Sequence, residues 1–209
     1  MRDTGLSEVP NPSALFLDGR GEASSGAAVF AGLEGSRPVL TEIQALVAPA
    51  AFGTPRRAVV GWDSGRLAMV LAVLEARCGV SFAWKDVYLN VAGGLRINEP
   101  AADLAVAAAI ASSAFDVPLP KDSVVFGEIS LSGDVRPVGR SDARLKEAAK
   151  LGFKTAITAK PAKKSTKNDN AALPIIAIKA LPDLISRVEA SSARGLEDDS
   201  AWGSSAKAA

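Results

Sequence analysis

The sequence predicts a single mixed α/β domain, and three observations support this. The chain has 209 residues with a hydrophobic share of 48%, which is enough for one well-buried core. Strand-like segments are interleaved with segments in which apolar residues recur at helical spacing. Their predicted order is a hairpin, a helix, a strand, a helix, a strand, a helix, two short strands and a last helix. This order is typical of α/β architecture with mixed sheets.

The first half of the predicted domain opens with a hairpin. An apolar strand over 26–35 is followed, after a glycine turn, by an alternating strand over 38–48. The segment 58–62 then leads into a helix over 66–77, where leucine, methionine and valine recur at helical spacing. A strand over 86–92 completes this half.

The second half begins with a helix from residue 99 to about 114. Nearly all of its residues are small and apolar, so the helix is expected to be buried on most sides. The continuous apolar run 123–129 predicts one strand at the centre of a sheet. The remaining predicted elements are a helix over 141–151 ended by Gly152, strands over 155–158 and 175–178, and a helix over 180–188.

The two ends of the chain are expected to lie outside this domain. Residues 1–25 are interpreted as a linker with a short helix over 13–17, and the domain itself as residues 26–190. Residues 191–209 have the composition of a disordered tail. Trp202 is unusual there, and a solvated side chain is favoured over a docked one.

Composition excludes several classes of chemistry. The chain has 24 lysines and arginines against 23 aspartates and glutamates, so nucleic-acid contacts must come from local patches. Histidine is absent and Cys78 is the single cysteine, which excludes Ser-His-Asp and Cys-His catalysis and cysteine-rich zinc sites. Cys78 ends a predicted helix and is interpreted as a packing residue, with a reactive thiol as the alternative. Because the sequence shows neither a signal peptide nor a long apolar run, a cytoplasmic protein is expected.

Two long segments carry a family resemblance. They are DVYLNVAGGLRINEPAADLAVAAAIASS (86–113) and VVFGEISLSGDVRPVGRSDARLKEAAKLGF (124–153). They resemble the proteolytic domain of Lon and, more closely, the Lon-like domain that ends RadA/Sms DNA-repair proteins. The upstream pieces NPSALFL, RPVLTEIQALV and TPRRAVVGWDSGRLAMVLAVL extend the resemblance to about Glu8–Glu189. It implies the Lon proteolytic-domain fold and assembly into a hexameric ring.

The resemblance also identifies two degenerate catalytic positions. Ala101 occupies the position of the Lon nucleophilic serine, and Asp142 occupies the position of the lysine base. A serine–lysine dyad needs a hydroxyl that attacks and an amine that accepts its proton. The chain is therefore predicted to have no catalytic residues, and a cryptic peptidase using Lys146 is the alternative. Ser112 and Ser113 lie about three helical turns beyond Ala101, too far to replace the serine.

Cofactors and partners are implied by the family alone. Complete RadA-type proteins are expected to be DNA-dependent ATPases that drive branch migration beside a RecA-type recombinase. ATP, Mg and Zn would be bound by domains that precede this one, because the chain has neither a phosphate loop nor a four-cysteine cluster. No cofactor or metal is expected here. The expected partners are further copies of the chain and single-stranded or branched DNA, with no membrane.

Two basic features are candidates for DNA contact. They are the pair Arg56 and Arg57, and the loop lysines Lys160, Lys163, Lys164 and Lys167. Such side chains bind the DNA backbone without reading its sequence. The alternatives are a subunit-interface ion pair for the arginines and simple surface solvation for the lysines. No aromatic residue interleaves either feature in the sequence, so base stacking is not supported.

Four charged residues lie within apolar motifs: Asp103, Glu128, Arg136 and Arg144. Because buried charges must be paired, these residues are expected to form salt bridges within the fold or across a ring interface. A structural role is favoured over catalysis. The resemblance favours a non-proteolytic domain that acts as hexamer scaffold and DNA-contacting module for branch migration. A purely structural oligomerisation or protein-docking domain without DNA affinity is the next alternative, and the cryptic peptidase is the last.

Overall fold

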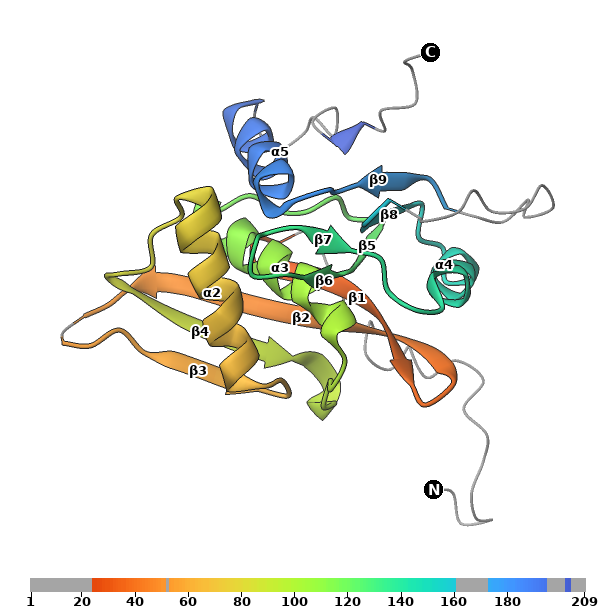
Figure 1. The fold of residues 1–209 in the computed structure, drawn as a ribbon, viewed down its shortest axis with the longest axis horizontal. Helices are drawn as coiled ribbons and strands as arrows, with labels where there is room; N and C mark the ends of the chain where they lie inside the picture. Colours follow the sequence, from red (N-terminus) through yellow and green to blue (C-terminus); the bar gives the residue numbers. More distant parts are fainter. Residues whose placement is uncertain (1–23, 52, 161–172, 195–201, 204–209) are drawn as a thin grey trace, which may run out of the picture.

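The structure, a computed structural model, describes residues 24–51, 53–160, 173–194 and 202–203. It confirms the mixed α/β class, with a seven-stranded sheet, a small two-stranded sheet and packed helices (Figure 1). The large sheet contains β1 (Ala27–Glu34), β2 (Arg37–Pro49), β3 (Arg57–Val60), β4 (Lys85–Val91), β5 (Ser123–Phe126), β8 (Thr155–Thr158) and β9 (Ile175–Ala177). The small sheet pairs β6 (Glu128–Ile129) with β7 (Val135–Arg136). The helices are α2 (Ser64–Cys78), α3 (Asp103–Phe115), α4 (Ser141–Lys150) and α5 (Leu181–Arg194), with 3-10 turns η1 (Ala92–Gly94) and η2 (Pro100–Ala102).

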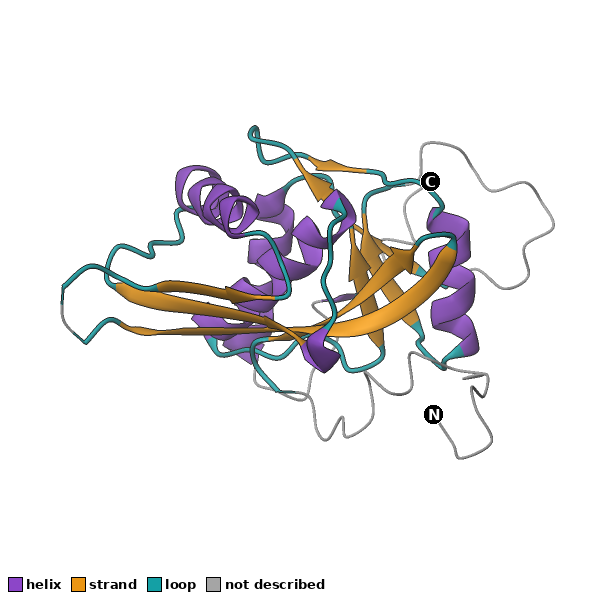
Figure 2. Cartoon of the chain, turned by 90° about the horizontal axis from the view of Figure 1, so that it is seen from below, coloured by secondary structure: helices purple, strands orange, loops and turns teal. Residues whose placement is uncertain are grey.

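The large sheet has the order β3-β4-β2-β1-β5-β8-β9. The predicted hairpin is confirmed, since β1 and β2 pair antiparallel from Ala27↔Gln44 to Glu34↔Arg37. β2 and β4 are also antiparallel, whereas the other neighbours in the sheet are parallel. Figure 2 shows the long strands nearly edge-on with helices above them.

Helices α2 and α3 supply much of the core. The Asp63 carboxylate caps α2 by accepting a hydrogen bond from the Arg66 N–H, and Gly79 ends the helix in the left-handed conformation. All residues of α3 from Asp103 to Ser112 are buried, as its apolar composition predicts. In the part of the chain that the structure describes, no helix is both long and apolar enough to cross a membrane.

The apolar run 123–129 forms two strands, not the single strand that the sequence predicts. The break falls at Gly127, whose N–H donates to the Ala101 carbonyl at 2.8 Å and whose carbonyl accepts from the Leu104 N–H at 3.0 Å. A β-carbon at Gly127 would lie 3.0 Å from the Val135 side chain, so glycine permits this close approach. The backbone of Gly127 therefore holds the start of α3.

The C-terminal end also differs from the prediction. Helix α5 continues to Arg194, past the predicted helix end at 188 and the predicted start of the tail at 191. Trp202 is only 5% exposed, so the expectation of a solvated tryptophan is wrong. Its ring lines a cavity of about 340 Å³ with Pro174 and Ile176, and apolar packing outweighs solvation there. The predicted linker covers residues 1–25. Residues 1–23, which include the predicted short helix over 13–17, lie outside the described residues, and only Ser24 and Ser25 of the linker are described.

Candidate functional site

The start of α3 and the start of α4 face each other across a cleft of about 400 Å³. Its lining includes Glu99, Pro100 and Ala101 before α3, Glu128 from β6, and Gly139, Arg140 and Arg144 around the start of α4. The methyl group of Ala101 is 3% exposed and is held in place by the Gly127 hydrogen bond to its carbonyl. The cleft thus contains the position that the resemblance assigns to the nucleophile.

The side chain that enters this cleft from α4 is Arg144 and not Asp142. Asp142 is exposed, and neither it nor Lys146 is among the residues that line the cleft within the described chain. Arg144 is 1% exposed, although its guanidinium carries a charge. An arginine cannot replace the lysine base, because its guanidinium stays protonated.

Arg144 is held by a dense set of hydrogen bonds. It donates to both carboxylate oxygens of Glu99, at 3.1 Å from Nη1 and 2.5 Å from Nη2. Nη1 also donates to the Ala31 carbonyl at 2.6 Å, and Glu99 accepts from the Leu33 N–H at 2.7 Å. This bidentate pair joins three parts of the fold: strand β1, the segment that precedes α3, and helix α4. It also places a fixed pair of opposite charges in the cleft.

The sequence did not predict that Glu99 is the partner of Arg144. The signal was present in the motif comparison, because Glu99 stands where the Lon motif Asp-Gly-Pro-Ser-Ala-Gly has its first glycine. A carboxylate beside the degenerate nucleophile position requires a cationic partner when it is removed from solvent. The pairing itself depends on the distance across three segments, which the sequence does not give.

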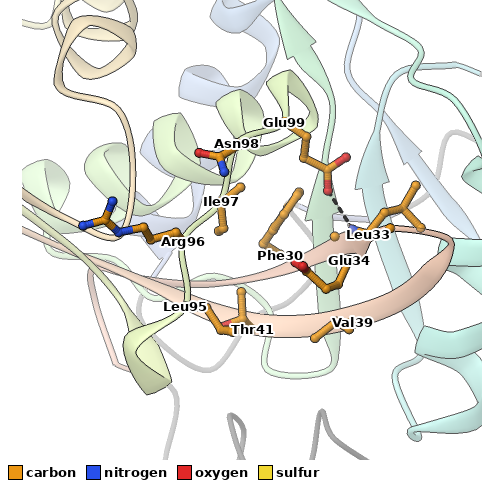
Figure 3. A pocket seen from close by; sticks show the side chains of 12 residues that line it. Phe30, Leu33, Glu34, Val39, Thr41, Leu95, Arg96, Ile97, Asn98 and Glu99 are labelled. Atoms are coloured by element: carbon orange, nitrogen blue, oxygen red, sulfur yellow. Dashed lines mark hydrogen bonds between the residues drawn. The ribbon is translucent and has the colours of Figure 1, made fainter.

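An apolar pocket of about 480 Å³ adjoins the cleft, between the β1–β2 hairpin and residues 95–99. Phe30, Val39 and Ile97 line it, and it shares Leu33 and Glu99 with the cleft. Figure 3 shows the Glu99 carboxylate directed at the Leu33 backbone N–H. The lining side chains of this pocket include no lysine that could serve as a base.

Asp103, which is fully buried, is paired with Arg66 of α2. The guanidinium donates to Asp103 at 2.6, 2.8 and 3.0 Å, and the Ile129 N–H donates at 3.1 Å. Burial raises the pKa of the Asp103 carboxyl, while these hydrogen bonds oppose the shift. Hydrogen bonding to Asp103 raises the pKa of Arg66, which stays charged. The pair joins α2, α3 and β6.

Glu128 and Arg136, the other predicted interface charges, are register partners across β6 and β7. Glu128 is half-buried and lines the cleft, whereas Arg136 is exposed. Ser112 and Ser113 accept hydrogen bonds from the backbones of Gly26 and Val47, far from the cleft. Among the residues with described positions, no group of three acidic or cysteine side chains could hold a metal ion.

The predicted DNA-contacting residues lie on separate surfaces. Arg57, on the edge strand β3, donates to the carbonyls of Arg56, Lys85 and Phe82 at 2.9, 2.5 and 2.9 Å. Lys160 is exposed beyond β8, five strands away in the sheet order, or roughly 24 Å at the usual strand spacing. Lys163, Lys164 and Lys167 lie outside the described residues.

Comparison with known proteins identifies the family. Residues 52–162 match the family model described as subunit ChlI of Mg-chelatase, which covers more than half of the chain. The chain is 63% identical over 193 residues to the DNA repair protein RadA of Brucella abortus, an alignment that covers 92% of this chain and 41% of the relative. It is 57% and 52% identical over 160 residues to the RadA proteins of Rickettsia bellii and Aquifex aeolicus, covering 77% of this chain and 36% of each relative. The chain thus spans about two fifths of the length of these relatives. It belongs to the ChlI family of Lon-like domains and is homologous to DNA repair protein RadA over most of its length.

Proposed function

We propose that this chain is a non-proteolytic Lon-like domain that serves a RadA-type DNA repair protein as hexamer scaffold and DNA-contacting module. The observation that carries the proposal is the cleft: a methyl group at Ala101 stands at the nucleophile position, and the Glu99–Arg144 pair crosses the space beside it. Acyl transfer needs a nucleophile and a neutral base, and these groups supply neither. Retention of the fold in this chain without these groups favours a binding or assembly role.

The wider context of the proposal comes from the homologous proteins. In a full-length RadA-type protein, ATP, Mg and Zn would be bound outside this domain, which itself would need no cofactor. Branch migration beside a RecA-type recombinase would then be powered elsewhere and would use this domain for ring contacts and for holding DNA. We place such a protein in the cytoplasm, at the nucleoid.

The absence of peptidase activity is tested with labelled casein and short peptides. The wild-type chain is expected to release no fragments. Ala101→Ser is expected to remain inactive as well, since Arg144 stays paired with Glu99 and no amine enters the cleft. Turnover that disappears in Lys146→Ala would instead establish the cryptic peptidase.

Assembly and DNA binding are tested together by light scattering and by gel shift at 50 and 200 mM salt. The proposal expects concentration-dependent oligomers and DNA binding that weakens steeply with salt. Oligomers that bind no DNA even at 50 mM salt would favour the purely structural alternative. A monomer at all concentrations would contradict the scaffold role.

A further inference from the structure

The β3 side of the large sheet exposes an unusual group of apolar side chains. Trp84 is 78% exposed, Val60 59%, Leu46 57% and Tyr88 36%. The residues are far apart in sequence, but the strand register brings two of them together, since Tyr88 pairs with Leu46 of β2, while Ala58 of β3 lies on its other side. The small Ala58 beside Tyr88 leaves room next to its ring.

Trp84 is exposed on a backbone that is fixed on both sides. It lies in the turn before β4, which the Lys85 N–H closes by donating to the Phe82 carbonyl at 3.2 Å. The Trp84 carbonyl accepts from the Ala50 N–H at 2.9 Å, and Arg57 donates to the carbonyls on both sides of the turn. The indole is therefore presented to solvent from a rigid turn, which lowers the entropy lost when a ligand binds it.

Three basic residues flank the turn that carries Trp84. Arg56 and Arg57 are exposed at the start of β3, and Lys85 is half-buried at the start of β4. The nearby Asp86 carboxylate accepts hydrogen bonds from the Arg56 N–H at 2.7 Å and from the Tyr88 hydroxyl at 3.3 Å. The Glu75 carboxylate also lies at this turn, where it accepts from the Phe82 N–H at 2.8 Å. Three cations against two carboxylates leave the surface with a small net positive charge that favours phosphate.

This arrangement corrects one conclusion from the sequence. Arg56 and Arg57 have no aromatic neighbours along the chain, so base stacking was not supported. The parallel pairing of β3 with β4 places Arg57 opposite Val87 and Ala58 opposite Tyr88, next to the turn that carries Trp84. Because successive side chains of a strand point to opposite faces, Arg56 shares the Tyr88 face of the sheet, whereas Arg57 lies on the face of the buried Val87 and holds the turn.

We propose that Trp84, Tyr88, Arg56 and Lys85 form a binding surface for single-stranded DNA. Unpaired bases would stack on the two rings while phosphates contact the cations, the combination that sequence-tolerant single-strand binding uses. The rings are four residues apart, or roughly 13 Å along an extended strand, so one flexible strand can reach both. Paired bases do not present their faces, and duplex DNA would gain the phosphate contacts alone. The inference rests on the proposed DNA contact and names its site and its ligand.

The test compares two ligands, a twelve-residue oligothymidylate and an abasic strand of equal length, by fluorescence anisotropy at 50 mM salt. Trp84→Ala is expected to weaken oligothymidylate binding about tenfold and to leave abasic binding unchanged. Trp84→Phe, which keeps an aromatic ring, is expected to retain most of the affinity. Arg56→Ala is expected to weaken both ligands equally. Leu131→Ala is the matched control, because Leu131 is 69% exposed on the turn between β6 and β7, and it should change neither.

Three results would overturn this surface. The first is a Trp84→Ala chain that binds oligothymidylate like wild type, and the second is an equal loss on the abasic strand. The third is a change of oligomer mass in Trp84→Ala without any change in DNA affinity, which would identify a protein–protein contact. Failure of the wild type to bind either strand would refute the proposed DNA role itself, whereas the first two results refute only the stacking surface.

Discussion

At the scale of single residues, the Arg66–Asp103 pair shows how the domain accommodates a buried charge. The Asp103 side chain is fully buried, but the Arg66 side chain is 32% exposed and reaches solvent. Loss of Asp103 would therefore leave a guanidinium that water can hydrate, together with an unpaired Ile129 N–H. Loss of Arg66 would leave a buried carboxylate without its counter-ion, which is costly.

We expect Arg66→Ala to lower the free energy of unfolding by about 3 kcal/mol at neutral pH. Because burial raises the pKa of Asp103, the folded state favours the protonated carboxyl, and without Arg66 the shift would be larger. The free energy of unfolding of the variant should then fall as the pH rises above about 4, the ordinary pKa of a carboxyl group. Conversely, the difference in free energy of unfolding between wild type and variant should shrink as the pH is lowered toward 4. Urea unfolding between pH 4 and 8 measures this, with Arg77→Ala on the same helix as control. A loss that is equal at every pH would contradict the explanation.

Cys78 illustrates the same effect of burial on a thiol. It ends α2, and burial raises the pKa of its thiol to about 11. The thiolate is the reactive form, so the native protein at pH 8 is expected to react with iodoacetamide on the order of 100-fold more slowly than the urea-unfolded chain. Mass spectrometry of timed samples gives both rates. Equal rates in the two states would show that Cys78 is a reactive thiol.

At the scale of elements, the break between β5 and β6 determines where α3 begins. Gly127 exchanges two backbone hydrogen bonds with residues at the start of α3, and its missing side chain leaves space for Leu104 and Val135. The sequence shows only a continuous apolar run at this point, because a glycine inside such a run fits a strand as well as a break. The elements β1, β2 and α4 lie within one residue of their predicted bounds, since their periodicity is local.

Gly127→Val is expected to lower the free energy of unfolding by about 2–3 kcal/mol through overcrowding against Leu104 and Val135. Thermal melts of the purified chain measure this change. Gly139→Ala is the matched control, because a β-carbon at Gly139 would meet nothing within 4 Å. Equal melting temperatures for Gly127→Val and wild type would show that the strand break tolerates a side chain.

At the scale of the whole molecule, charge is distributed in local groups while the net charge is only +1. If Arg56 and Lys85 contact phosphates, the affinity for a single strand should fall roughly 7-fold between 50 and 200 mM salt. An anisotropy titration series in salt measures the slope. An affinity independent of salt would exclude phosphate contact as a source of binding.

The sequence predicted the mixed α/β fold because the elements follow from periodicity and motif order, whereas the two degenerate catalytic positions stay a prediction that rests on the family resemblance. It could not predict that Arg144, rather than Asp142, enters the cleft, because the pairing with Glu99 depends on three segments meeting in space. The contact of Trp202 with the ends of the strands was missed for the same reason. The sequence likewise could not predict that Arg57 lies beside the turn that carries Trp84, because this depends on the register of β3 against β4.

The position of β1 in the middle of the sheet has a consequence for synthesis on the ribosome. Its first neighbour, β2, follows at once, but its parallel neighbour on the other side is β5, where Phe30 lies opposite Val125. A nascent chain that has emerged only as far as α3 carries β1 with one long hydrogen-bonding edge unpaired. Such edges promote association between chains, and long-range parallel pairing is slow. Synthesis of β5 therefore ends the interval in which this edge of β1 is open to other chains.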